Sequence, residues 1–229
     1  MAYEYIERNY RLLTEELSEL AHRAGRSSVT LVSVTKSGSD EELLALAAAG
    51  ATDIGENRPG ELRRRGELLS LAGFSPRLHE IGTLQRNKVK YIIENVALIH
   101  SVDSLKLAKE IERQAERVGR RVPVLIEVNS AREENKGGVL PELAEELFLA
   151  VRKLPHLSVS GVMTMGPVCR DPEDIRPYFR IARGVYENLL DKYGFEGEGV
   201  LSMGMTDSYR VAVREGATLV RVGRRLFEK

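Results

Sequence analysis

A lysine ends a stretch that otherwise has the composition of a buried strand. Residues 29–35 read VTLVSVT, a run of β-branched and apolar residues, and Lys36 follows directly. The small residues 37–39, SGS, then predict a turn before a helical stretch. Partial desolvation disfavours the charged form of a lysine, so its amine becomes nucleophilic and suited to a Schiff base. The alternative is a strand-end lysine whose amine simply reaches water.

Two glycine-containing segments near the C-terminus favour phosphate binding. Ser202 begins the segment SMGMTD, and Gly223 follows the apolar run that ends at Val222. Gly204 and Gly223 allow backbone N–H groups to approach an anion closely, and Ser202 adds a hydroxyl. Each glycine taken singly is better explained by a tight turn, but both segments together favour a phosphate site. An amine facing such a site is the pattern for a Schiff base with a phosphorylated carbonyl compound.

These residues require a scaffold that brings the ends of several strands together. Apolar runs alternate with amphipathic stretches, and the candidate strands are 29–35, 52–55, 77–82, 96–101, 122–129, 157–163, 199–203 and 217–222. Eight strands alternating with helices in 229 residues predict an α/β fold, a single (β/α)8 TIM barrel. An open doubly wound sheet is the alternative, but no G-x-G-x-x-G follows any of the strands.

Polar residues gather at the ends of these candidate strands. In a TIM barrel the strand ends and their following loops meet at one rim, where small-molecule sites lie. The segments include GEN at 55–57, HEIG at 79–82, HSVD at 100–103 and EVN at 127–129. His79 and His100 are candidate bases, although hydrogen-bonded structural histidines are the better interpretation.

Capping residues mark the predicted helices. Ser39 and Glu42 have the spacing of a capping box, and Asp171 followed by Pro172 predicts an N-cap with a first-turn proline. A helix over about residues 2–25 precedes the first strand, and almost nothing follows the eighth. We therefore expect this N-terminal helix to cover the part of the barrel wall that a final helix normally covers. A single domain over residues 1–229 is expected.

Composition excludes several classes of protein. The 34 basic and 34 acidic residues balance, which argues against a nucleic-acid partner. Basic runs such as residues 63–65 lie near glutamates on a helical pattern and are interpreted as solvated faces. The first residues include acids and have no apolar core, so a signal peptide is not expected, and no apolar run is long enough to span a membrane. The single cysteine, Cys169, cannot form an internal disulfide, so a cytoplasmic location is expected.

Several short motifs follow one another in a specific order along nearly the whole chain. They are VSVTK ending at residue 36, GEN at 55–57, HEIGTLQRNK at 79–88, IHSVDSLKLA at 99–108, GVMTMGP at 161–167, LSMGMTDSYRVAVREGAT at 201–218 and VRVGRRLF at 220–227. Together they resemble the pyridoxal phosphate homeostasis protein family. The resemblance implies a barrel similar to the N-terminal domain of alanine racemase.

The same resemblance implies a cofactor and a set of site residues. Pyridoxal 5′-phosphate (PLP) would form a Schiff base with Lys36, and Arg221 would approach its pyridine nitrogen. Motif matching places the phosphate near Ser202, the backbone of Met203, Gly223 and Arg224. It places the ring near Asn57 and the segment from Met163 to Met165. The family implies a PLP carrier or regulator without catalytic residues or a metal, and PLP-dependent apo-enzymes are its candidate partners. A monomer is expected, because the second domain through which racemases usually dimerise is not expected here.

The chain departs from the family pattern at three places. Leu78 stands where an aromatic residue is common before the histidine, and residues 135–138 read NKGG where a serine or threonine is usual. Arg224 replaces a residue that is often small, so a side-chain contact with phosphate is not expected there, although a backbone contact is. None of these changes affects Lys36 or Arg221.

Two other functions fit a barrel with a reactive lysine. One is a PLP-dependent, racemase-like enzyme, which needs a base on the opposite face of the cofactor; the sequence shows no second domain to supply it. The other is an aldolase that uses a lysine Schiff base without PLP, in which Arg221 has no evident task. Absorbance distinguishes the aldolase, because only a PLP Schiff base makes the protein yellow.

Overall fold

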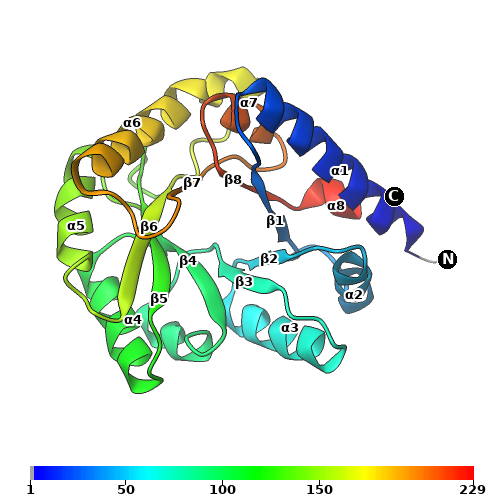
Figure 1. Cartoon of the computed structure of the whole chain (residues 1–229), viewed down its shortest axis with the longest axis horizontal. Coiled ribbons are helices and arrows are strands. Elements are labelled where there is room, and N and C mark those ends of the chain that lie inside the picture. The colour runs from blue at the N-terminus through cyan, green and yellow to red at the C-terminus, as the bar shows by residue number, and fades with distance from the viewer. Residues whose placement is uncertain (1–2) are drawn as a thin grey trace.

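A computed structural model describes residues 3–229, and in it eight parallel strands close into a barrel with helices outside (Figure 1). The strands pair in sequence order, and the last returns to the first. They are β1 Thr30–Val34, β2 Asp53–Glu56, β3 Arg77–Glu80, β4 Val96–Val102, β5 Val122–Glu127, β6 Leu157–Met163, β7 Val200–Ser202 and β8 Leu219–Val222. Each lies within a predicted strand or overlaps it, so the predicted TIM barrel is confirmed.

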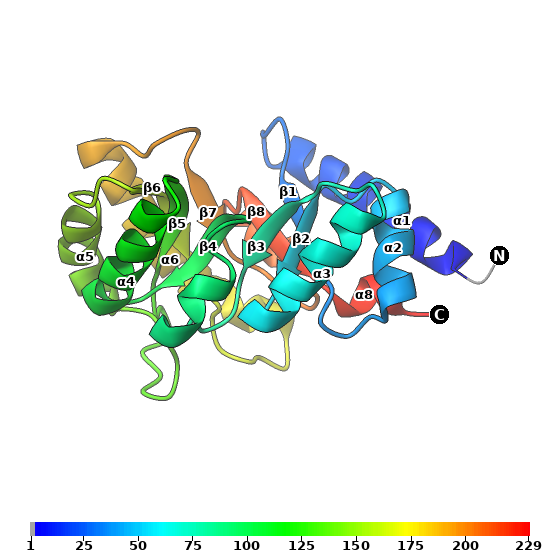
Figure 2. The same ribbon diagram turned by 90° about the horizontal axis from the view of Figure 1, so that it is seen from below.

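Helices surround the barrel and follow the strands in turn (Figures 1 and 2). The α-helices are α1 Glu4–Arg23, α2 Asp40–Ala48, α3 Pro59–Leu71, α4 Leu105–Arg117, α5 Ala144–Val151, α6 Arg176–Tyr193, α7 Tyr209–Arg214 and α8 Arg224–Phe227. Short 3₁₀ helices are η1 Arg86–Tyr91, η2 Pro141–Leu143 and η3 Pro172–Ile175. The predicted capping box of Ser39 and Glu42 is present, and the Asp171 side chain accepts a hydrogen bond from Glu173 N at 2.9 Å.

The N-terminal helix α1 lies against α8, α7 and α2 (Figure 1). Its buried residues are spaced four or seven positions apart, which places them on one face of the helix: Ile6, Leu13, Leu17 and Ala21. Asn9 Nδ2 donates to the carbonyl of Glu228 at 2.6 Å, which ties the helix to the other end of the chain. Because α8 has only four residues, α1 supplies apolar cover on this side. The predicted start near residue 2 lies outside the described residues.

Apolar side chains occupy two layers, one between the strands and the helices and one inside the barrel. The inner layer consists of Val32, Val34, Ile81, Leu98, Leu125, Met163 and Leu219. Alternate residues of a strand face opposite sides of the sheet, so one strand can contribute to both layers, as β6 does with Val162 in the outer layer and Met163 in the inner one. Within residues 3–229, no helix is long and apolar enough to cross a membrane.

One prediction about the surface is wrong. Arg63 and Arg64 of α3 are exposed, but Arg65 is only 6% exposed. Leu62, Arg65 and Leu69 are the buried residues of this helix, and their spacing of three and four places them on one face. Arg65 therefore points between the helix and the barrel, where buried hydrogen-bond acceptors surround its guanidinium.

Candidate functional site

Lys36 lies in a turn at the end of β1, on the rim where the strands finish. The N–H of Gly38 donates to Thr35 O at 2.9 Å, so Lys36 and Ser37 are the two central residues of the turn. Ser33 pairs with Val222, which puts the turn beside the end of β8. Lys36 is exposed. The partial desolvation expected from the sequence is therefore not supplied by burial within the protein.

Arg221 of β8 places a buried cation near the same rim. Its side chain is almost completely buried, and it donates to Ser202 Oγ at 2.5 Å and to Thr164 O at 3.0 Å. Burial lowers the pKa of Arg221 to about 10, and the charge of Glu127 opposes this shift. The guanidinium is consequently positive at neutral pH, and the carbonyl and hydroxyl acceptors fix its direction.

A chain of buried hydrogen bonds extends from Arg221 across the barrel interior. Beyond Ser202, His100 Nδ1 lies 3.0 Å from Ser202 Oγ, and His100 Nε2 lies 3.0 Å from His79 Nδ1. His79 Nε2 then lies 2.8 Å from Asp53 Oδ1. Both histidines are therefore fully engaged structural residues, as the sequence favoured.

The electrostatics of this chain assign the direction of its hydrogen bonds. Burial lowers the pKa of His100 well below its ordinary value, and the nearby charge of Arg221 adds to this effect. Burial alone would raise the pKa of Asp53, but hydrogen bonds from His79 and other donors outweigh it and lower the pKa to about 2. With His100 neutral, one assignment satisfies every group: Ser202 donates to His100, His100 to His79, and His79 to Asp53.

This arrangement requires a revision of the expected phosphate contacts. Ser202 is fully buried, and its hydroxyl already bonds to Arg221 and His100. The N–H of Met203 donates to Leu219 O at 3.2 Å within the sheet. The hydroxyl that lies beside Gly223 is instead that of Thr206, which accepts a hydrogen bond from Gly223 N at 3.3 Å. Thr206 lies in the same predicted segment, SMGMTD, but was not singled out from the sequence.

The other expected site residues lie around the same rim. Asn57 follows β2. Its backbone lies so close to Gly82 that a Cβ atom added to Gly82 would be only 2.3 Å from the Asn57 carbonyl oxygen. Met163 is buried inside the barrel, whereas Met165 is partly exposed beyond the end of β6. Arg224 is exposed and forms an ion pair with Asp207. The side chain of Arg224 is thus paired with a carboxylate, which is consistent with the expectation that only its backbone contacts a phosphate.

Two buried carboxyl groups near the rim have strongly raised pKa values. Burial raises the pKa of Glu127 to about 7; the charge of Asp103 adds to this effect and that of Arg221 opposes it. Burial raises the pKa of Glu80 to about 8, although the N–H of Gly82 donates to one of its oxygens. The other oxygen of Glu80 is buried without a hydrogen-bond partner. Glu80 is therefore held mostly as the neutral acid at pH 7.

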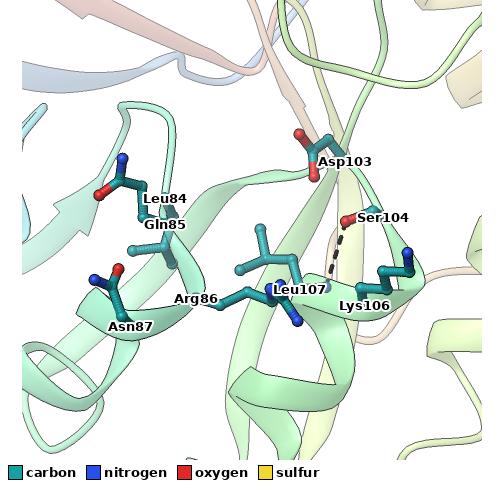
Figure 3. Close-up of a pocket in the computed structure, with 8 residues that line it drawn as sticks. All are labelled: Leu84, Gln85, Arg86, Asn87, Asp103, Ser104, Lys106 and Leu107. Atoms are coloured by element: carbon teal, nitrogen blue, oxygen red, sulfur yellow. Dashed lines mark hydrogen bonds between the residues drawn. The ribbon is translucent and has the colours of Figure 1, made fainter.

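A hollow of about 570 Å³ lies at the same rim, between the segment after β3 and the start of α4 (Figure 3). It is lined by Leu84, Gln85, Arg86, Asn87, Asp103, Ser104, Lys106 and Leu107. Ser104 caps α4 by accepting from Leu107 N at 3.3 Å, as the dashed line shows. None of the expected cofactor residues lines this hollow, so it is distinct from the candidate site.

Comparison with known proteins finds relatives over nearly the whole chain. The family model for the alanine racemase N-terminal domain matches residues 9–228. The pyridoxal phosphate homeostasis protein of Aquifex aeolicus is 41% identical over 223 residues, which cover 96% of each chain. The protein of the same name from Helicobacter pylori is 34% identical over 203 residues, or 88% of each chain.

Solved structures show the same relationship. PipY of Synechococcus elongatus, with PLP bound, has a TM-score of 0.84 and 27% identity, and the match covers 97% of this chain and 100% of that one. Alanine racemase of Clostridium difficile has a TM-score of 0.73 and 16% identity, covering 97% of this chain and 56% of that chain. The second match shows a shared fold alone, and it confirms the predicted likeness to the barrel of alanine racemase.

Proposed function

The chain belongs to the pyridoxal phosphate homeostasis protein family, and on that premise we propose that it holds PLP through a Schiff base on Lys36. The observation that supports this proposal is the meeting of three unlike groups at one rim. They are the amine of Lys36, the buried guanidinium of Arg221, and the hydroxyl of Thr206 beside the N–H of Gly223. An aldehyde, a ring nitrogen and a phosphate are the complementary groups of PLP, so the donor set fits the cofactor.

Lys36 provides the covalent attachment. When bound, PLP supplies an aldehyde carbon, to which Lys36 Nζ forms a C=N bond with loss of one water. The turn that carries Lys36 is exposed, so water and other amines reach the same position. Such access favours a reversible attachment, which a protein that stores and releases its ligand requires.

Thr206 and the backbone at Gly223 and Arg224 anchor the phosphate in this proposal. The Gly223 N–H donates to the Thr206 hydroxyl, so the two groups lie side by side, and the hydroxyl hydrogen can be donated to an anion bound there. Ser202 acts one step further away, because its hydroxyl holds Arg221 in place. Asn57 and the segment from Met163 to Met165 are proposed to lie beside the ring, at the ends of β2 and β6.

We propose a carrier and not an enzyme, because Arg221 disfavours carbanion chemistry. A cation facing the pyridine nitrogen keeps that nitrogen unprotonated, since adjacent positive charges repel. An unprotonated ring is a weaker electron sink for a carbanion at an amino-acid α-carbon. His79 and His100 support the same proposal, because the hydrogen-bond chain occupies all four of their ring nitrogens.

Exchange of the α-proton of alanine distinguishes the carrier from the racemase-like alternative. The PLP-loaded protein is incubated with L-alanine or D-alanine in deuterated water, and both deuterium incorporation and chirality are followed. The carrier proposal predicts slow exchange without racemisation. Turnover of about 1 per second or faster, the scale of ordinary enzymes, would contradict it and favour the racemase-like enzyme.

PLP-dependent apo-enzymes are the proposed recipients of the cofactor. The loaded protein should reactivate such an apo-enzyme even when a phosphatase removes free PLP from solution. Loss of reactivation in the presence of the phosphatase would show that only free PLP is transferred and would contradict a direct partnership.

A further inference from the structure

The turn that carries Lys36 is held from inside by Arg65. The Arg65 Nη1 group donates to Thr35 O, and Nη2 donates to Gly38 O at 2.7 Å. These two carbonyls belong to the first and last residues of the turn, so the guanidinium brackets Lys36 and Ser37. A planar group with parallel donors can hold two carbonyls in one geometry, which a single ammonium cannot do.

Glu56 fixes the direction of this guanidinium. Its Oε1 accepts from Arg65 Nη1 at 2.8 Å and from Thr35 Oγ1 at 2.5 Å. The side chains of Arg65 and Glu56 are 8% and 2% exposed, so the ion pair is shielded from water. Glu56 is the central residue of the GEN motif, and it thereby links the end of β2 to the end of β1.

Phe227 of α8 confines the turn from the other side. A Cβ atom at Gly38 would lie only 2.5 Å from the Phe227 ring, so the backbone of the turn packs directly on the aromatic side chain. The turn is therefore enclosed by Arg65 on one side and by Phe227 on the other. The side chain of Lys36 remains exposed while its backbone is fixed.

We propose that Arg65 is a positioning residue that sets the direction in which Lys36 presents its amine to the aldehyde. This inference rests on the proposed Schiff base at Lys36. Because the lysine side chain is long and flexible, the protein controls its approach through the backbone of residues 35–38. Arg65 does not touch the cofactor in this account. It acts through Thr35 and Gly38, and Glu56 supports it.

Three variants of α3 test the proposal: Arg65→Met, Arg65→Lys and Arg63→Met. Arg63 is an exposed arginine of the same helix, paired with Glu67, and serves as the matched control. Arg65→Met should form the reducible imine with PLP about 10- to 100-fold more slowly, the scale of a misplaced reacting group. Arg65→Lys should fall between this variant and the wild-type protein, and Arg63→Met should behave as the wild type.

Two further measurements separate positioning from general damage. 4′-Deoxypyridoxine 5′-phosphate lacks the aldehyde, so its affinity reports on the pocket without Lys36 chemistry and should stay within about twofold in all variants, a change below 0.5 kcal/mol. Amide hydrogen exchange of residues 36–39 in the PLP-free protein should accelerate in Arg65→Met and not in Arg63→Met. Arg65→Lys provides the same comparisons if Arg65→Met does not fold.

The outcomes distinguish this inference from the function on which it rests. If the wild-type protein binds the deoxy analogue but forms no reducible imine with PLP, the proposed Schiff base is wrong. If the wild type forms the imine and the Arg65 variants match it in both imine formation and amide exchange, the positioning role is wrong. Equal losses of imine formation and analogue affinity would assign Arg65 to the pocket as a whole and would also overturn the inference.

Discussion

The hydroxyl groups of Thr206 and Ser202 lie in one short segment but have different partners. Thr206 accepts from Gly223 N at the rim, whereas Ser202 bonds to Arg221 and His100 inside the barrel. Thr206→Val should therefore weaken PLP binding by about 1.5–3 kcal/mol, the value of a hydrogen bond to a charged group. Unphosphorylated pyridoxal should lose little affinity. Thr206→Ser keeps the hydroxyl and is the control.

The effect of Ser202→Ala should appear mainly in protein stability. The substitution leaves His100 Nδ1 and one N–H of Arg221 without their shared partner in a buried region. An unsatisfied buried polar group costs about 1–3 kcal/mol, which urea unfolding can measure. If Ser202→Ala instead abolished the preference for PLP over pyridoxal while Thr206→Val left it intact, our assignment of the two hydroxyls would be reversed.

Glu80 should make stability depend on pH. Burial raises the pKa of this carboxyl from its usual 4.5 to about 8, and the charge of Glu56 on the paired strand adds to the shift. The folded state thus binds more protons than the unfolded state between these values, so stability falls as the pH rises through this window. Glu80→Gln keeps an acceptor for Gly82 N and carries no charge.

The Glu80→Gln variant should consequently be more stable than the wild type at pH 9, by at least about 1 kcal/mol, or about 2–4 °C in Tm for a protein of this size. At pH 5 the two proteins should differ much less. Thermal unfolding at both pH values measures the difference, and Glu94→Gln at an exposed position is the control. A pH-independent difference between variant and wild type would contradict a neutral Glu80.

Elements with a clear apolar period could be predicted from the sequence. Strands such as β1 and β5 are largely apolar runs, and helices such as α2 have a local cap like Ser39, so neighbouring residues alone determine them. The burial of Arg65 could also have been predicted, because its spacing from Leu62 and Leu69 places it on the buried face of α3. The run of three arginines concealed this signal, since composition alone indicates solvent exposure.

The contacts inside the barrel could not be predicted in the same way. His100 and Ser202 are separated by 102 positions, and they meet only because the strands close into a ring. The roles of Ser202 and Thr206 depend on where the three-residue strand β7 ends, because side-chain direction alternates along a strand. Sequence patterns leave strand ends uncertain by more than the single residue that decides this question.

Helix α1 should be an integral part of the barrel wall. Leu13 is fully buried, whereas the neighbouring Leu12 is 46% exposed. Leu13→Ala should cost about 2–5 kcal/mol in the free energy of unfolding, the usual range for a buried leucine. Leu12→Ala should change stability by about 0.5 kcal/mol or less, as expected for a surface substitution. Similar small effects for both variants would indicate that α1 is only loosely associated.

At the scale of the whole molecule, one rim of the closed barrel brings together the groups proposed to bind one ligand. Lys36 from β1, Arg221 from β8 and Thr206 after β7 come together because β8 pairs with β1 and with β7. The amine of Lys136, in contrast, is held by Glu133 and by Gly166 O in a different loop. Lys36 differs from Lys136 in this respect, because no hydrogen bond or ion pair from the described residues holds its amine.

The central claim is tested most directly by locating the covalent attachment of PLP. The purified protein is mixed with PLP and treated with borohydride, which reduces the imine to a stable secondary amine, and the labelled peptide is identified by mass spectrometry. We predict a single label at Lys36, with no label in Lys36→Ala and only weak, non-covalent binding through the phosphate groups. A label at Lys88 or Lys136, or an unchanged label in Lys36→Ala, would contradict the account.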